Sequence, residues 1–131
     1  MKIPLRLLPI CALLAACGTS DTLVKGAAGA SVRIPAGAAA PGLVISVTAA
    51  DSSAPPLPSQ LTPLGADFAF LPHGAQFSSA VTITVPFERS SRSPRLYTAL
   101  PGGTWQPVPG AIASGTALQA LVTHFSFFRV V

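Results

Sequence analysis

Proline and glycine interrupt this chain so often that no stretch of it keeps a helical period. The 131 residues include 14 prolines and 11 glycines, and both residue types disfavour helix interiors. Short β-branched and apolar runs recur between them, a pattern typical of an antiparallel sandwich or barrel. The sequence therefore predicts a single all-β domain, an antiparallel β-sandwich over residues 23–131, that follows a cleaved N-terminal segment.

The clearest predicted strand covers residues 80–87, where apolar and polar or small residues alternate. This alternation turns Val81, Ile83 and Val85 toward one face of a sheet. Residues 42–48 and 66–71 show shorter versions of the pattern. Weaker candidates are 23–25, 31–34, 95–100, 104–108 and 117–122, with 123–131 as the last strand. The proline-rich segment 51–65 predicts a long extended loop, the best candidate for a contact surface.

Residues 1–16 have the three-part layout of a secretory signal peptide. The cations Lys2 and Arg6 precede an apolar stretch over 7–14, and two small residues follow it. That stretch is far shorter than the ~20 residues that span a bilayer. The segment is therefore expected to be removed rather than to remain as an anchor.

Cys17 directly follows this segment in the run Leu14-Ala15-Ala16-Cys17. The run resembles the lipobox of bacterial lipoproteins, and an ordinary signal peptide with a chance cysteine is the alternative. The resemblance implies cleavage between Ala16 and Cys17 and acylation of the cysteine, for example with palmitate. Residues 17–22 would form the lipidated N-terminus and a short linker. Gly18, where aspartate would favour the inner membrane, implies export to the outer membrane.

Loss of residues 1–16 changes what composition says about the mature chain. Lys2 and Arg6 contribute two charges to the formal net charge of +4, and the remainder is too weak to indicate nucleic-acid binding. Cys11 is removed as well, so the mature chain keeps only Cys17 and forms no internal disulfide. An apolar core must supply its stability.

A series of short landmarks along the domain resembles the ZU-five family. This β-sandwich is shared by ankyrins, netrin receptors and zonula occludens proteins and is also found in bacterial surface proteins. The landmarks are Val32-Arg33-Ile34-Pro35-Ala36-Gly37-Ala38, the segments 70–77 and 81–86, Leu96-Tyr97, Trp105 and Thr123-His124-Phe125-Ser126. The resemblance implies a binding or scaffolding domain over residues 23–131.

The tripeptide His124-Phe125-Ser126 resembles the site at which some proteins with this domain cut themselves. In that reading the Ser126 hydroxyl attacks the carbonyl carbon of Phe125, and His124 takes or relays the proton. The reaction also needs a distorted peptide at a bend between strands. The alternative is that this aromatic stretch is an ordinary strand whose side chains alternate between two faces.

Other chemistry has little support in the sequence. No GxSxG, CxxC, HExxH or glycine-rich phosphate-binding pattern occurs. His73, Asp67 and His124 are the residues that would have to meet at a metal, but they are scattered, and we predict neither a metal nor another cofactor. His73 is expected to lie exposed in the turn between Pro72 and Gly74.

The leading expectation is thus a lipid-anchored, non-catalytic binding or structural domain at the bacterial cell envelope, more specifically at the outer membrane. Its partners would be the membrane, through Cys17, and an envelope protein or glycan. The first alternative is self-processing between Phe125 and Ser126. The second is a small hydrolase or carbohydrate-active lipoprotein, for which exposure of Trp105 and Tyr97 would count in favour and burial against.

Overall fold

The structure is a computed structural model that describes residues 21–88 and 92–131. The predicted signal peptide, the Ala16–Cys17 cleavage site and the lipidation site Cys17 lie outside the described residues. In the described ranges, no helix has the length and apolar character needed to cross a membrane.

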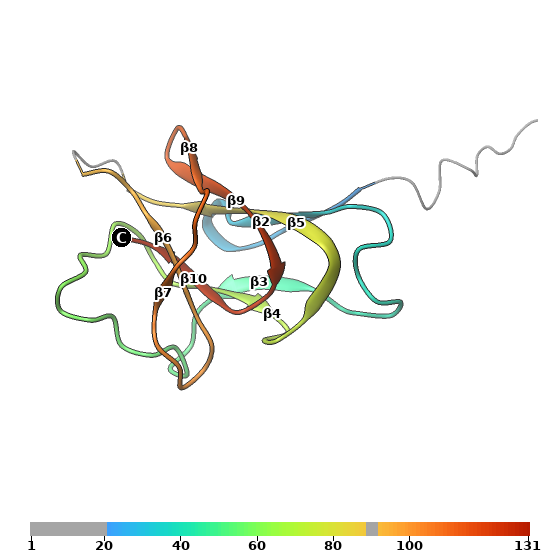
Figure 1. Cartoon of the computed structure of the whole chain (residues 1–131), viewed down its shortest axis with the longest axis horizontal. Coiled ribbons are helices and arrows are strands. Elements are labelled where there is room, and N and C mark those ends of the chain that lie inside the picture. Colours follow the sequence, from blue (N-terminus) through green and yellow to red (C-terminus); the bar gives the residue numbers. More distant parts are fainter. Residues whose placement is uncertain (1–20, 89–91) are drawn as a thin grey trace, which may run out of the picture.

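Two five-stranded antiparallel sheets pack face to face, as Figure 1 shows. The first sheet has the order β1 (Thr22–Lys25), β2 (Ser31–Ile34), β5 (Gln76–Pro86), β9 (Ala117–His124) and β8 (Ile112–Ser114). The second sheet has the order β3 (Ser46–Ala49), β4 (Phe68–Leu71), β10 (Phe127–Val130), β6 (Leu96–Ala99) and β7 (Gln106–Pro107). A single 3-10 turn, η1 (Ala27–Gly29), joins β1 to β2. The prediction of an all-β sandwich is confirmed.

The main core lies between the two sheets and is built by the alternation seen in the sequence. Val81, Ile83 and Val85 of β5 are fully buried, whereas the residues between them are half-buried. Val32, Leu118 and other inward residues of the first sheet meet residues such as Phe70 of the second. Full burial of an aliphatic side chain contributes about 1.5–3 kcal/mol. Residues 21–131 contain no cysteine, so the apolar core rather than a disulfide within this range stabilises the sandwich.

A second, smaller cluster lies on the outer face of the second sheet. Trp105, Tyr97 and Phe127 form its centre, and Leu57 and Leu61 of the proline-rich segment pack against it. The green segment in Figure 1 is this loop. Residues 51–65 therefore form an irregular loop, as predicted, but the loop covers a sheet face with its own apolar side chains.

Several predicted strand boundaries need correction. Residues 123–131 are not one strand: Thr123 and His124 end β9, and β10 begins at Phe127. In the predicted segment 42–48, only the last residues pair, because a turn with Gly42 at positive φ precedes them. β5 starts at Gln76, before the predicted 80–87, and the strand β8 was not predicted at all.

Candidate functional site

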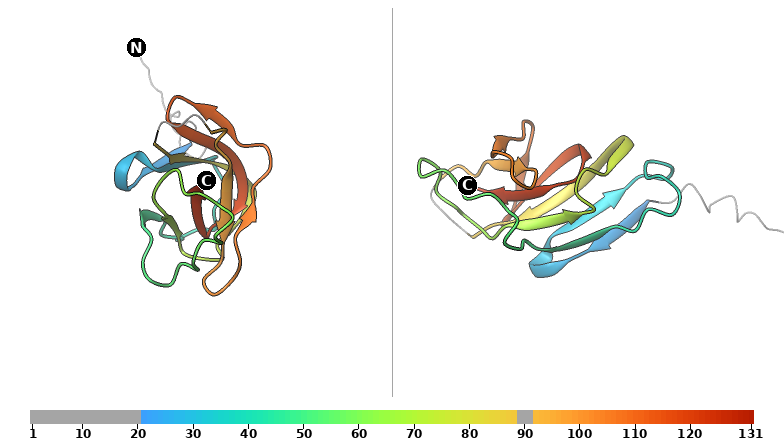
Figure 2. Two further views of the ribbon diagram at one scale, coloured as in Figure 1. Left: turned by 90° about the vertical axis from the view of Figure 1, so that its left-hand side faces the viewer. Right: turned by 90° about the horizontal axis from the view of Figure 1, so that it is seen from below.

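The Phe125–Ser126 peptide lies where the chain leaves one sheet for the other. β9 belongs to the first sheet and β10 to the second, so the two residues between them form the crossing. A second crossing, from β4 to β5, runs beside it through the turn at residues 72–75. In Figure 1, β5 bends toward β4 and β9 curves toward β10, and Figure 2 shows the same ribbon from two further sides. The self-processing hypothesis requires a bend between strands at this peptide, and the chain changes sheets there.

Backbone hydrogen bonds fasten the two crossings to each other. The Phe125 N–H donates to the Ala75 carbonyl at 2.9 Å, and the Gly74 N–H donates to the Phe125 carbonyl at 2.9 Å. The Phe70 N–H donates to the Ser126 carbonyl at 3.0 Å. Gly74 has φ 80°, a conformation that glycine adopts without the steric cost of a Cβ atom. Glycine therefore allows the turn to aim this N–H at the Phe125 carbonyl.

The side chains of the crossing are completely buried. Phe125 and Ser126 each have 0% exposure, and the Phe125 ring contacts Phe77 with ring centroids 4.7 Å apart. The Ser126 hydroxyl donates a hydrogen bond to the carbonyl oxygen of Ala99 in β6. The hydroxyl is thus a satisfied buried donor, and it must leave Ala99 before it attacks a neighbouring carbonyl.

His124, the third member of the predicted constellation, lies at the end of β9. It is half-buried and pairs in register with Gln76 of β5. Two adjacent hollows of about 270 Å³ and 480 Å³ share His124 and Thr98 in their walls. The larger one is also lined by Thr104 and Gln106. His124 therefore faces a partly open, uncharged groove between the strands β7 and β9.

The residues considered for a metal do not come together. Among residues 21–88 and 92–131, no group of three histidine, cysteine or acidic side chains is arranged to hold a metal ion. The His73 ring lies against the Phe127 ring, with centroids 4.4 Å apart. His73 is half-buried, so the expectation that it is exposed is wrong. The turn folds its ring back onto the outer face of the second sheet.

Asp67 instead belongs to an ion pair that the sequence did not reveal. Its Oδ2 accepts from Nη1 of Arg129 at 3.1 Å, and Nη2 of Arg129 donates to the Gly65 carbonyl at 3.1 Å. Burial raises the pKa of the Asp67 carboxyl above its usual value, and the charge of Arg129 acts in the opposite direction. The Arg129 guanidinium also lies 6.0 Å from the centroid of the Trp105 ring. These contacts tie β10 to the covering loop.

Trp105 and Tyr97 are buried, with exposures of 6% and 9%. Their burial counts against a sugar-binding platform, which needs exposed aromatic faces. The Trp105 indole is further occupied by a hydrogen bond to the Pro55 carbonyl. Both side chains serve the packing of the second sheet.

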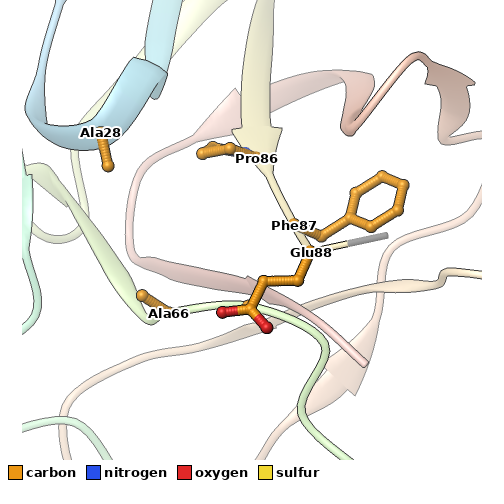
Figure 3. A pocket seen from close by; sticks show the side chains of 6 residues that line it. Ala28, Ala66, Pro86, Phe87 and Glu88 are labelled. Atoms are coloured by element: carbon orange, nitrogen blue, oxygen red, sulfur yellow. The ribbon is translucent and has the colours of Figure 1, made fainter. Parts of the chain in front are cut away.

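A third hollow, of about 210 Å³, opens where residues 64–66 approach the end of β5. Figure 3 shows the Glu88 side chain extending toward Ala66, while the Phe87 ring turns away. The Glu88 N–H donates to the Leu64 carbonyl at 2.7 Å. Glu88 is the one acidic residue in the lining, and a single carboxylate does not provide the acid–base pair of a glycosidase.

No model of a known protein family matches the chain, and no curated protein matches it either.

Proposed function

We propose that this chain is a bacterial lipoprotein whose β-sandwich serves as a non-catalytic binding or structural domain at the cell envelope. The observation that carries the proposal is the sequence run Leu14-Ala15-Ala16-Cys17 after a short apolar stretch. The anchor is acylated Cys17, and cleavage follows Ala16. The membrane is the outer one, as Gly18 favours.

The position of the first strand supports this proposal. β1 begins at Thr22, five residues after Cys17. Five extended residues reach roughly 17 Å, so the sandwich of an acylated chain stays close to the bilayer. Partners of the domain, whether an envelope protein or a glycan, must then lie in the same layer.

The chemistry of the described residues also supports a non-catalytic role. Asp67 is held by Arg129, Asp51 accepts hydrogen bonds from Ser53, and Ser126 is bound to Ala99. A binding or scaffolding role agrees with the ZU-five resemblance, which we retain as part of the proposal.

Fractionation of cells that express the full chain tests the proposed anchor. Wild-type protein is expected in the outer-membrane fraction, where detergent releases it and salt washing does not. The variant Cys17→Ser lacks the acylated thiol and is expected to leave that fraction. Wild-type protein recovered entirely in the soluble fraction would contradict the proposal.

A second candidate function is self-processing between Phe125 and Ser126. The observation that favours it is the hydrogen bond from Gly74 N–H to the Phe125 carbonyl, since a donor held on this oxygen would stabilise the negative charge that develops during attack. The Ser126 hydroxyl would form an ester with Phe125 as the amide nitrogen departs with a proton. Water would then hydrolyse the ester, with His124 as the proton relay.

Intact mass after long incubation tests this second candidate. A species that ends at Phe125 and is absent from Ser126→Ala supports it. A full-length mass that persists in the wild type rejects it and leaves the anchor proposal unchanged.

A further inference from the structure

The outer face of the first sheet presents two rows of side chains whose neighbours are fixed by strand register. One row crosses four strands in the order Leu23, Arg33, Thr82 and Leu121. The next row crosses five strands in the order Lys25, Ser31, Thr84, Gln119 and Ile112. The Gln119 amide donates to the Thr84 hydroxyl at 3.4 Å, which agrees with their places on the same face.

This face combines exposed cations with exposed large aliphatic side chains. Leu23, Ile112 and Leu121 are 44%, 71% and 68% exposed, and Lys25 and Arg33 are exposed beside them. Isolated exposed leucines are common on protein surfaces. Here three large aliphatic side chains share one sheet face with two cations, and the second sheet has its own outer face covered by the loop 51–65.

Lys25 and Arg33 are the charged residues of these two rows. In the described part of the chain, no carboxylate forms an ion pair with Lys25 or Arg33. Asp51 and Asp67 belong to the other sheet and its loop, and Glu88 extends toward Ala66 (Figure 3). The nearest acid along the chain is Asp21, which precedes β1. A surface of this composition complements anionic groups above an apolar layer.

We propose that the outer face of the first sheet docks on an anionic lipid surface. Lys25 and Arg33 contact headgroup phosphates, while Leu23, Ile112 and Leu121 enter the interfacial region of the leaflet. A second copy of the chain is a poorer occupant, because a two-fold contact through these two rows brings Lys25 and Arg33 of both copies together and neither row supplies an acid to pair with them.

The position of β1 fits this orientation of the domain. Leu23 and Lys25 lie on the first strand, which directly follows the segment leading from Cys17. Only this argument about orientation rests on the proposed function, because it assumes an acyl anchor on Cys17 that holds the face near the bilayer. Such a tether raises the local concentration of the face at the bilayer surface, so weak contacts suffice to orient the domain.

Vesicle binding by the full chain carrying Cys17→Ser tests the face without an acyl anchor. The probes are vesicles of phosphatidylethanolamine with phosphatidylglycerol, and phosphatidylcholine vesicles are the uncharged reference. We expect the phosphatidylglycerol-dependent partition coefficient to fall roughly 25-fold in Lys25→Gln/Arg33→Gln, or about fivefold per cation at low salt. Residues 1–16 are common to all variants and cancel in the comparison.

The double variant Arg92→Gln/Arg95→Gln is the matched control, because it removes the same charge from exposed positions between β5 and β6. The phosphatidylglycerol-dependent partition coefficient of this control is expected to stay within about twofold of the value for the parent chain. Equal losses in the two double variants, or no preference for phosphatidylglycerol, would overturn the proposal. A dimer that Lys25→Gln/Arg33→Gln dissociates would overturn it too. Because the chain in this assay is not acylated, none of these results bears on the acylation of Cys17.

Discussion

The indole N–H of Trp105 donates a hydrogen bond to the carbonyl oxygen of Pro55, with a donor–acceptor distance of 2.9 Å. The two residues are 50 positions apart, and the bond joins the segment after β6 to the proline-rich loop. Trp105 is thereby a structural residue that holds the loop over the second sheet.

Replacing Trp105 with phenylalanine should lower the free energy of unfolding by about 1–3 kcal/mol. Phenylalanine keeps an aromatic ring in the cluster but leaves the Pro55 carbonyl without its donor. Urea denaturation measures the change. Gln106→Ala, at the exposed neighbouring position, is the control and should change stability by less than about 0.5 kcal/mol. Equal values for the two variants would contradict the structural role of the indole.

Leu57 and Leu61 should stabilise the domain although both belong to an irregular loop. Each is partly buried against the second cluster, so truncation of either to alanine should cost about 1–2 kcal/mol. Gln60→Ala changes an exposed residue between them and serves as the comparison. A loop that does not pack on the sheet would show no difference among the three variants in urea denaturation.

Replacing Ser126 with alanine should destabilise the domain by about 1–3 kcal/mol, because the buried Ala99 carbonyl loses its donor. Ser79→Ala, at an exposed site in β5, should be nearly neutral. Thermal unfolding of both variants gives the comparison. If Ser126→Ala is as stable as Ser79→Ala, the hydroxyl is not needed for packing, and the self-processing reading gains support.

Asp67 should make stability fall as pH rises, because its folded-state pKa is raised above the usual 3.8. A carboxyl with a raised pKa binds its proton more tightly in the folded state. Its favourable contribution is therefore complete below about pH 3.8 and is lost as pH rises through the folded-state pKa. The free energy of unfolding of the wild type minus that of Asp67→Asn should decrease across this range.

The titration of Asp51 also changes stability with pH and must be distinguished from that of Asp67. Hydrogen bonds from Ser53 lower the pKa of the Asp51 carboxyl. The contribution of Asp51 to the free energy of unfolding is therefore lost as pH falls, which is the opposite pH dependence to that of Asp67. Because Asp51 is unchanged in Asp67→Asn, the difference between the two proteins isolates Asp67. A difference that is flat or rises with pH would show that Arg129, rather than burial, dominates the pKa of Asp67.

The sequence predicts the sandwich well where each strand has one buried face, as in β5, whose Val81, Ile83 and Val85 alternate with half-buried residues. The pattern fails after His124, since Phe125, Ser126, Phe127 and Phe128 are all buried. Because consecutive side chains in this segment are all buried, the sequence shows no alternation of apolar and polar residues that would mark the break between β9 and β10. β8 is a three-residue edge strand whose side chains are all exposed, so it is too short to show the alternation of a half-buried strand.

The candidate site shows a similar division. His124, Phe125 and Ser126 are predicted from adjacent positions, whereas the contacts of Ser126 and of the nearby Arg129 reach distant segments. Ala99 lies 27 positions from Ser126, and Asp67 lies 62 from Arg129. Such pairings depend on which strands become neighbours, and local patterns carry no information about that.

The intact mass of the mature protein, extracted in detergent from the outer membrane of cells that express the full chain, tests the central claim most directly. The account predicts a polypeptide that begins at Cys17 and carries the added mass of acyl chains on that residue. Cys17→Ser should yield no acylated species. A mature chain that begins elsewhere, or one that begins at Cys17 with a free thiol, would contradict the account.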